Sequence, residues 1–457
     1  MRYHVTLAAA KAASRLSRVM GRGGGQALPG VVAEKFDPKV AAQLARQLPG
    51  GVVMVTGTNG KTTTTKLIRE ILEADNLSVV TNATGSNLKR GVVSALVAAT
   101  DARGRLRGDI GLFEVDEANV RLVAPLVKPR AIVVTNLFRD QLDRYGELDS
   151  TARLIGEGIA ACDAEVFLNA DDPLVASLAS YAKYAKRVHY FGIEGAPVNP
   201  VGQHQTAIDS DRCPKCRSRL DFSRVFYGHI GHYRCPKGDF SRPAPSVVVT
   251  NVESADQTGT EFVLAVDGRR TALSVPLPGT YNLYNALAAI SLGTALGAGV
   301  EKIGEVLART TAAFGRVERV QIDGRTLCLL LIKNPAGFTQ VLQTFVIGTE
   351  AVRVLFVVND LAADGRDVSW LWDVPLEALA GSRDAVFTTG IRGADMALRL
   401  KYAGLGPVQT GSVAEGIAAV LAATPVGGTA YVLPTYTAML EVRKVLSGQV
   451  AMAEMGS

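Results

Sequence analysis

The sequence has little of several features that would place it in other protein classes. It has no uninterrupted apolar run of about 18 residues, the length that a membrane-spanning helix needs. Its 457 residues include five cysteines, which are too few for a disulfide-stabilised scaffold. Charged residues make up 20% and hydrophobic residues 47%, which excludes a largely disordered chain. We therefore expect two or three domains with packed cores.

Acidic residues are absent from the first 25 positions. Lys11, Arg15, Arg18 and Arg22 stand there among small apolar residues. Such a segment fits a docked first helix, a basic helix lying on a surface, or a transit peptide. It lacks an apolar core followed by a cleavage site, so we expect a cytoplasmic chain. The net charge of +6 admits nucleotides, nucleic acids or anionic lipid surfaces as partners without choosing among them.

From residue 52 onward, short apolar segments alternate with amphipathic ones. This pattern predicts an α/β fold with a mostly parallel sheet covered by helices on both faces. The first unit is predicted to hold strands at 52–55, 79–80, 110–113, 131–134, 165–168 and 246–249, and helices at 62–74 and 282–296. The second is predicted to hold strands at 327–331, 352–358, 385–389 and 430–433, and helices at 338–345, 394–402, 413–423 and 438–446.

A glycine-bearing loop joins the first predicted strand to the first predicted helix. A loop in this position directs backbone N–H groups and a helix N-terminus toward phosphate groups. Lys61 would act on the β- and γ-phosphates, and the Thr62 hydroxyl is a candidate Mg²⁺ ligand. Val55 stands where the common form of this loop has its first glycine. The expected nucleotide-binding residues are Gly57, Thr58, Asn59, Gly60, Lys61, Thr62 and Thr63.

The loop sequence Thr-Gly-Thr-Asn-Gly-Lys-Thr-Thr, at 56–63, resembles that of Mur ligases and folylpolyglutamate synthases. These enzymes use ATP to activate a carboxylate as an acyl phosphate and then form an amide. Residues 114–119 resemble the family's acidic strand end, which implies that Glu114 and Glu117 hold Mg²⁺ together with Thr62. Residues 135–143 resemble a Thr-Asn … Asp-His-Leu-Asp stretch, with Gln141 where many members have a metal-binding His.

Three later segments resemble family motifs in the family's order. Residues 168–173 resemble another strand end. Residues 281–286 resemble a helix start that reaches the adenine, which implies that Asn282 and Asn285 bind nucleotide. Residues 315–318 resemble the Gly-Arg-x-Glu hinge into the third domain, which implies that Arg316 lies near the nucleotide.

Three of the cysteines cluster in a segment without long apolar periodicity. Cys213 and Cys216 form a knuckle whose two thiolates can share one Zn²⁺, and Cys235 follows. A four-cysteine ribbon would have its last ligand at position 238, where this chain has Gly238. Either the module folds without metal, or a fourth ligand comes from His229, His232 or Asp239. We expect a ribbon-like insert at 205–245, with any zinc in a structural role.

A ribbon inserted in a Mur ligase central domain resembles the MurT branch of the family. Further similarities to this branch are Gly-Gly-Gly … Leu-Pro-Gly at 23–30, Lys-Asn-Pro-x-Gly at 333–337, and an acidic segment with two Trp at 359–373. The resemblance implies a Mur ligase-type P-loop central domain at 51–314 and a Rossmann-like C-terminal domain at 315–457, with residues 1–50 packed on the central domain.

The implied activity is amidation of a peptidoglycan precursor. ATP and Mg²⁺ would activate the D-glutamate α-carboxylate of lipid II, and ammonia would convert it to D-isoglutamine. Cys162 and Cys328 sit in apolar surroundings without a nucleophile motif, so this chain is not expected to release ammonia from glutamine. The resemblance implies a heterodimer with a GatD-like class I glutaminase, at the inner face of the membrane where the lipid-linked substrate lies.

In this branch the ligase subunit also lends an Asp that orients the catalytic His of the partner. Asp360, Asp367 and Asp364 are the candidates here, in that order of preference. Asp360 directly follows a predicted strand, at the end where α/β folds carry functional groups. Asp367 is a candidate helix cap, and Asp364 precedes Gly365 in a predicted turn.

Two other functions were weighed. One is an autonomous ligase that adds an amino acid, as folylpolyglutamate synthases do; the ribbon and the short segment before the phosphate loop disfavour it. The other is a nucleic-acid-binding ATPase, which the basic residues of the ribbon would suit. No helicase-like motif follows the loop, and salt-dependent retention on DNA would test this alternative.

Overall fold

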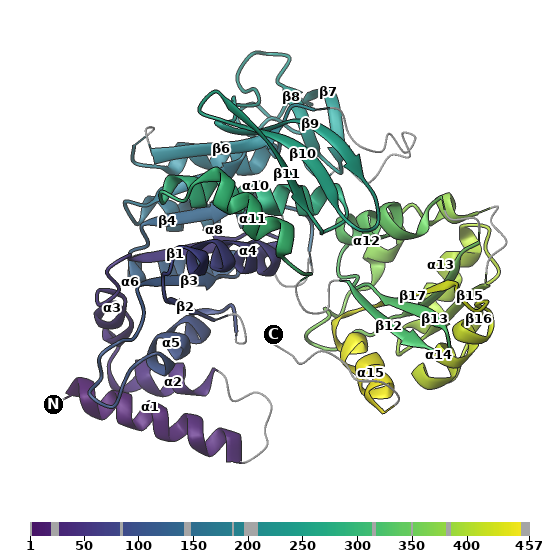
Figure 1. The fold of residues 1–457 in the computed structure, drawn as a ribbon, viewed down its shortest axis with the longest axis horizontal. Coiled ribbons are helices and arrows are strands. Elements are labelled where there is room, and N and C mark those ends of the chain that lie inside the picture. Colours follow the sequence, from purple (N-terminus) through teal and green to yellow (C-terminus); the bar gives the residue numbers. More distant parts are fainter. Residues whose placement is uncertain are drawn as a thin grey trace.

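The computed structural model describes residues 2–19, 27–82, 86–140, 148–184, 187–195, 209–312, 317–348, 351–380 and 385–448. These residues form a nine-stranded sheet, a six-stranded sheet and a two-stranded hairpin, with helices around both larger sheets (Figure 1). The predicted α/β architecture is confirmed. None of the described helices combines the length and the hydropathy that a membrane-spanning segment needs.

The nine-stranded sheet is parallel from β2 to β9 and antiparallel at its last two strands. In spatial order its strands are β11 (Arg269–Val275), β10 (Thr260–Val266), β9 (Val247–Ala255), β6 (Val188–Ile193), β5 (Glu165–Asn169), β4 (Ala131–Val134), β1 (Val52–Thr56), β3 (Ile110–Glu114) and β2 (Val79–Thr81). The sequence pattern predicts no strand at 260–275, whereas in the structure these residues form the antiparallel strands β10 and β11.

Helices cover both faces of this sheet, which explains why its central strands read as continuous apolar runs. Val52 and Met54 of β1 face one core, and Val53 and Val55 face the other. The helices of this unit are α1 (Arg2–Val19), α2 (Leu28–Phe36), α3 (Val40–Ala45), α4 (Lys61–Ala74), α5 (Lys89–Ala98), α6 (Val120–Val127), α8 (Leu148–Ala160), α9 (Pro173–Ser177), α10 (Thr280–Ala295) and α11 (Val300–Arg309).

The N-terminal helices stack on this unit, with α1 against α2 and α2 against α5 (Figure 1). Gly30 makes the second contact close, because a Cβ there would lie 2.0 Å from the carbonyl oxygen of Arg90. The hydroxyl of Tyr3 donates to the carbonyl oxygen of Gly104 at 2.7 Å. Lys11 Nζ donates to the carbonyl oxygen of Thr100, also at 2.7 Å. These bonds fix α1 to the loop that follows α5.

The ribbon-like insert contains a hairpin of β7 (Asp221–Tyr227) and β8 (Ile230–Arg234). Its cysteines pack with buried Leu220 and Tyr233, whose hydroxyl donates to the carbonyl oxygen of Ala170. The insert is thus joined to the end of β5 rather than hanging free. The predicted start at 205 lies outside the described residues.

The six-stranded sheet carries the C-terminal unit, and the expected boundary at 314/315 lies outside the described residues. In spatial order its strands are β12 (Glu318–Ile322), β13 (Arg325–Leu329), β17 (Thr429–Pro434), β14 (Arg353–Val357), β15 (Ala385–Thr389) and β16 (Val408–Gln409), all parallel except for β12 against β13. Its helices are α12 (Pro335–Val341), α13 (Gly393–Tyr402), α14 (Val413–Ala422) and α15 (Tyr436–Ser447). The predicted helix through 345 continues past α12 as a wider turn over Leu342–Val346.

Candidate active site and cysteine cluster

The predicted phosphate loop lies between β1 and α4. Gly57 and Gly60 have φ angles of 124° and 84°, in the left-handed region that favours glycine. A Cβ on Gly57 would lie 2.3 Å from Thr135 Oγ1, and one on Gly60 would lie 2.0 Å from Asn285 Oδ1. Backbone conformation and close packing therefore both require glycine at these positions.

The residues that follow β4 hold the loop in shape. The Asn136 side chain accepts from the Asn59 N–H at 2.9 Å and donates to the Asn59 carbonyl oxygen at 3.0 Å. The Thr58 hydroxyl accepts from the Phe138 N–H at 3.0 Å. The segments at 56–63 and 135–140, far apart in the sequence, thus lie together, whereas Gln141 and the rest of the predicted stretch lie outside the described residues.

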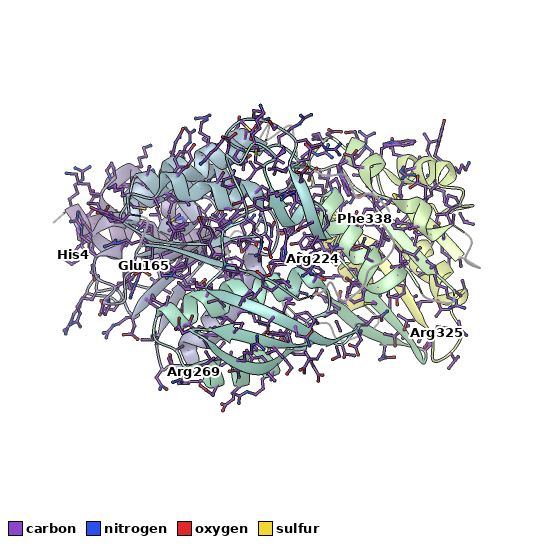
Figure 2. All side chains as sticks on the ribbon, turned by 90° about the horizontal axis from the view of Figure 1, so that it is seen from above. His4, Glu165, Arg224, Arg269, Arg325 and Phe338 are labelled. Carbon is purple, nitrogen blue, oxygen red and sulfur yellow. The ribbon has the colours of Figure 1, made fainter. Side chains whose placement is uncertain are left out.

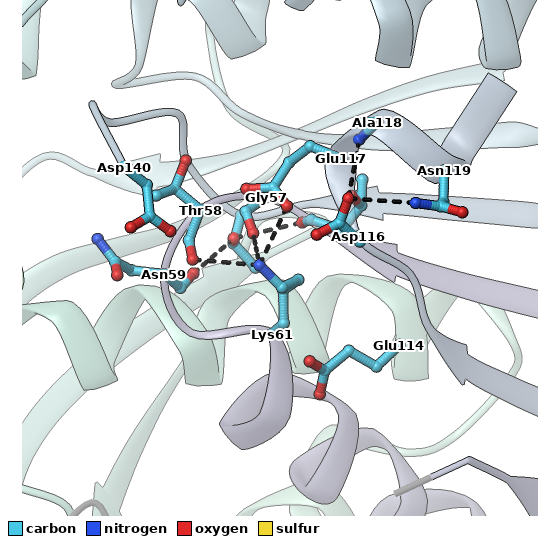
Figure 3. A network of polar contacts seen from close by, with 12 residues as sticks. Gly57, Thr58, Asn59, Lys61, Glu114, Asp116, Glu117, Ala118, Asn119 and Asp140 are labelled. Atoms are coloured by element: carbon cyan, nitrogen blue, oxygen red, sulfur yellow. Dashed lines mark hydrogen bonds and ion pairs between the residues drawn. The ribbon is translucent and has the colours of Figure 1, made fainter. Parts of the chain in front are cut away.

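Lys61 and Glu117 form a buried ion pair at 3.2 Å, with side chains 8% and 7% exposed (Figure 3). Lys61 Nζ also donates to the carbonyl oxygens of Gly57, at 2.5 Å, and Thr58, at 3.2 Å. Glu117 begins a short turn that Asp116 caps, its carboxylate accepting from the Ala118 N–H at 3.2 Å. The lysine and the acidic segment predicted from the sequence therefore meet in one polar network.

Burial alone would lower the pKa of Lys61, but the surrounding carboxylates, first Glu117 and then Glu114, Asp116 and Asp140, raise it above its usual value. The ammonium therefore stays charged. Burial raises the pKa of Glu117, and Lys61 opposes that rise. Each charge of the pair depends on the other, because removing one would leave an uncompensated charge in the protein interior.

A second polar contact lies beside this pair. The Thr62 hydroxyl donates to Glu114 Oε2 at 2.8 Å. The backbone N–H of Glu114 donates to Asn82 Oδ1 at 2.9 Å, and this bond fixes the position of Glu114. Thr62 and Glu114 thus bring together two oxygen atoms of the hard kind that Mg²⁺ prefers in proteins, and a shared magnesium site with Glu117 stays a prediction. Thr63 is buried on the first turn of α4.

Asn282 and Asn285 lie at the start of α10, directly behind the loop. They are 5% and 2% exposed. Asn285 Nδ2 donates to Asn282 Oδ1 at 3.1 Å, and Asn282 Nδ2 donates to the Pro278 carbonyl oxygen at 2.8 Å. The Asn285 amide occupies the space where a Cβ on Gly60 would lie, and contact of either residue with an adenine stays a prediction. Arg316 lies outside the described residues.

The C-terminal unit reaches the phosphate loop through Lys333 and Asn334. Asn334 Nδ2 donates to Asn59 Oδ1 at 3.0 Å, and Asn59 Nδ2 donates to Asn334 Oδ1 at 3.4 Å. Lys333 Nζ pairs with Asp140 Oδ2 at 2.6 Å. Lys333, Asn334 and Asp140 lie within segments that resemble family motifs, yet no sequence feature marks them as site residues. Their meeting depends on how two units pack, which local sequence patterns do not reveal.

The three candidate aspartates differ in their surroundings. Asp360, at the end of β14, is 7% exposed and accepts from Arg392 Nε at 2.9 Å. Asp364 is equally buried and accepts from the N–H groups of Leu361 and Thr437 at 3.1 and 2.8 Å. Asp367 is exposed and accepts from the Ser369 N–H at 2.8 Å. The N-cap of the short helix at Ser369–Asp373 is Val368 rather than the predicted Asp367.

The sulfur atoms of Cys213, Cys216 and Cys235 lie within 4.8 Å of one another. The separation of 3.4 Å between the Cys216 and Cys235 sulfurs suits thiolates that share one small ion. No carboxylate or imidazole from the described residues joins the three within that distance. His232 instead bonds the Ile193 carbonyl oxygen at 2.7 Å. Asp239 is exposed and directly follows Gly238.

His229 occupies the tip of the β7–β8 hairpin and is completely buried. Its ring centroid lies 4.6 Å from that of Phe138, and Nε2 lies 3.5 Å from Asp172 Oδ2. This position places it away from the cysteines, so it is not the fourth ligand in this structure. The Phe138 N–H donates to the Thr58 hydroxyl, so Phe138 contacts both the ribbon tip and the phosphate loop.

The chain matches two known protein families. Residues 55–212 match the Mur ligase middle domain, and residues 331–439 match the MurT ligase C-terminal family. The chain is 33% identical to the lipid II isoglutaminyl synthase (glutamine-hydrolyzing) subunit MurT of Streptococcus pneumoniae, over 95% of both chains. It is also 33% identical to the subunit of the same name in Staphylococcus aureus, over 88% of both chains.

Solved structures share the fold at lower sequence identity. A pseudomurein peptide ligase type C from Methanothermus fervidus has a TM-score of 0.68 and 23% identity, covering 87% of this chain and 78% of its own. MurF ligase from Thermotoga maritima, in complex with ADP, has a TM-score of 0.63 and 14% identity, covering 92% and 85%. Given its identity with curated subunits over nearly their whole length, the chain belongs to the MurT family of Mur ligases.

Proposed function

We propose that this chain is the ligase subunit of a glutamine-dependent amidotransferase that converts the D-glutamate α-carboxylate of lipid II to the amide. The observation that carries the proposal is the junction at which Lys333 and Asn334 meet the phosphate loop and Asp140. It places a third-domain motif of the MurT family against the loop that would hold ATP. The names of the curated relatives supply the substrate class.

The residues present fit ATP and Mg²⁺. Left-handed glycines at 57 and 60 keep side chains out of the loop, and Lys61 is held charged at its base. Thr62, Glu114 and Glu117 would hold Mg²⁺, which when bound neutralises phosphate charge. Two of these ligand atoms, Thr62 Oγ1 and Glu114 Oε2, lie 2.8 Å apart.

In the first step, an oxygen of the substrate α-carboxylate attacks the γ-phosphorus of ATP. The bond to the bridging oxygen breaks, ADP leaves, and an acyl phosphate forms. Lys61 stabilises the charge on the transferring group, and the N-terminus of α4 adds its dipole. In the second step, ammonia attacks the carbonyl carbon, inorganic phosphate leaves, and a proton is lost from nitrogen to give the amide.

The ammonia would come from a partner. Burial raises the pKa of the Cys328 thiol to about 11, and burial also raises the pKa of the Cys162 thiol. A glutaminase nucleophile needs the opposite shift, toward a reactive thiolate. The remaining cysteines form the cluster of the insert. A GatD-like class I glutaminase is therefore the expected second subunit.

Asp360 is the residue that we assign to the partner's histidine. Arg392 holds one carboxylate oxygen, Oδ2, at 2.9 Å, which fixes the side chain as an orienting group requires. The strands β14, β15 and β17 are neighbours in the sheet, and each is followed by an exposed apolar residue. These residues are Leu361, Ile391 and Tyr436, which are 43%, 58% and 48% exposed. Apolar residues with a central charged pair are typical of a protein–protein interface.

We assign the cysteine cluster to a structural Zn²⁺ with Asp239 as the fourth ligand of this chain. Asp239 directly follows Gly238, where a four-cysteine ribbon would place a thiolate, so it offers a carboxylate beside the position of the missing ligand. Bound structural zinc stabilises small modules by roughly 10–16 kcal/mol. Here it would fix the hairpin whose tip packs on Phe138.

The experiment is reconstitution of the two subunits with lipid II and ATP. Mass spectrometry of the released stem peptide should report conversion of one carboxyl to an amide, with glutamine or with ammonium as nitrogen donor. The partner should be needed for the glutamine reaction alone. Amidation by this chain with ammonium but without ATP would contradict the proposal. Incorporation of an amino acid in place of ammonia would support the autonomous ligase instead.

A further inference from the structure

The positive charge of the chain is concentrated in its first 50 residues. They contain eight basic and two acidic residues, a difference of +6 that equals the net charge of the whole chain. The remaining residues are therefore neutral in sum. The excess of basic residues therefore lies in the N-terminal segment of the sequence and not in the segments that form the nucleotide site and the ribbon.

Helix α1 presents a face to the outside that is basic and apolar. His4, Val5, Ala8, Ala12 and Arg15 are exposed, and their spacing places them on one side of the helix. Thr6, Leu7 and Ala10 on the other side are buried. No acidic residue occurs in this helix. Figure 2 shows His4 at the end of the molecule opposite Arg325 of the C-terminal unit.

Helix α2 lies beside α1 and adds larger exposed apolar side chains to this end of the molecule. Leu28, Val31 and Phe36 are 39%, 43% and 48% exposed, and Lys35 between them is exposed as well. Arg2 Nε donates to the Phe36 carbonyl oxygen at 2.8 Å, which places the end of α2 beside the start of α1. We call these outward residues of α1 and α2, together with exposed Lys39 at the start of α3, the N-terminal face.

The acidic residues at this end do not neutralise the face. Glu34 pairs with Lys89 at 2.7 Å. Asp37 is 6% exposed and accepts from the Lys39 N–H at 3.0 Å. Asp101 pairs with Arg107 at 3.0 Å. Each acid is either buried or matched by its own base, whereas Arg15, Lys35 and Lys39 point their charge into solvent.

The N-terminal face is linked to the active site by a short chain of contacts. Glu34 of α2 pairs with Lys89, whose N–H donates to Asn119 Oδ1 at 3.2 Å. Asn119 ends the turn that carries Glu117. A surface lying on α1 and α2 would therefore approach the edge of the site at which the acidic segment lies.

We propose that the N-terminal face docks on an anionic phospholipid membrane. Positive charge attracts the lipid headgroups, and Val31, Phe36 and Leu28 enter the boundary between headgroups and acyl chains, as in interfacial amphipathic helices. The proposal deepens the proposed function, since it gives a lipid-linked substrate a route to the site. Its test below requires no substrate, so the two can fail separately.

The experiment is flotation of the full-length protein with vesicles of phosphatidylcholine alone or with added phosphatidylglycerol. Binding should occur with the anionic vesicles and weaken as salt rises. The variant Arg15→Glu/Lys35→Glu/Lys39→Glu should partition at least a hundredfold less, at about fivefold for each basic residue. The matched control Arg269→Glu/Arg270→Glu/Lys401→Glu changes the net charge equally at exposed residues away from the face and should bind as the unchanged protein does.

Substitution of the apolar residues separates lipid from other polyanions. Val31→Ser/Phe36→Ser should weaken vesicle binding while leaving retention on DNA unchanged. Amidation of a water-soluble substrate analogue should be the same in all these variants, because none touches the site. Absence of vesicle binding, an equal loss in the control variant, or binding unaffected by Val31→Ser/Phe36→Ser would overturn the proposal, and the last result would favour nucleic acid.

Discussion

Asn59 of the phosphate loop and Asn334 at the start of α12 exchange two side-chain hydrogen bonds, at 3.0 and 3.4 Å. Asn334 also caps α12 by accepting from the Gly337 N–H at 2.9 Å. One side chain therefore joins the helix of the C-terminal unit to the loop of the central unit. The position of the loop and the packing of the two units are coupled through this pair.

Substituting Asn334 should separate its two roles. Asn334→Ser keeps a capping oxygen but is too short to reach Asn59, so stability should change little while turnover falls about 10- to 100-fold through misplacement of the loop. Asn334→Ala should lose turnover to the same extent and also about 1 kcal/mol of stability. Thermal unfolding and amidation rates check both. Full activity in Asn334→Ser would show that the junction does not position the loop.

Removing Lys61 should affect both activity and stability, because Glu117 is left buried without its partner. Lys61→Met should abolish ATP-dependent amidation and lower the free energy of unfolding by about 3–5 kcal/mol. The double variant Lys61→Met/Glu117→Gln removes both charges and should recover much of that stability but no activity. Chemical denaturation and a single-turnover assay measure the two effects. Residual turnover in either variant at saturating ATP would remove Lys61 from the mechanism.

The phosphate loop could be predicted from the sequence because its features are local: glycines that need unusual backbone angles, and a lysine at a helix start. The central strands were predictable because burial on both faces makes them continuously apolar. β10 and the edge strand β11 could not be predicted, because each has a partly solvated face that carries exposed residues such as Glu261 and Arg270. The pairing of Asn59 with Asn334, and of His229 with Phe138, arises from packing between distant segments and leaves no local pattern.

The cysteine assignment predicts which thiols react. Purified protein should carry close to one zinc per chain, and Asp239→Ala should lower the zinc content whereas Asp211→Ala, elsewhere in the insert, should not. After chelation, Cys213, Cys216 and Cys235 should become accessible to an alkylating reagent near pH 8. Cys162 and Cys328 should stay unmodified, because both are buried and burial raises the pKa of each thiol. Peptide mapping reads out the labels, and a metal-free protein with unchanged stability would refute the assignment.

Asp360 should matter for one nitrogen source and not for the other. Asp360→Asn should sharply reduce glutamine-dependent amidation in the reconstituted pair and leave amidation from free ammonium largely intact. Asp367→Asn is the matched control, since it alters the exposed carboxylate on the same segment. Loss of the glutamine reaction in Asp367→Asn alone would move the assignment to Asp367. Equal loss of both reactions in Asp360→Asn would place that residue in the ligase site.

Activation of the substrate carboxylate as an acyl phosphate is the central claim, and an isotope measurement tests it most directly. Lipid II labelled with ¹⁸O in the D-glutamate α-carboxylate would be converted by the reconstituted subunits with ATP and ammonium. Because a carboxylate oxygen becomes the bridge to phosphorus, mass spectrometry should find one ¹⁸O in the inorganic phosphate for each amide formed. Amide formation with no ¹⁸O in the released phosphate would contradict the account.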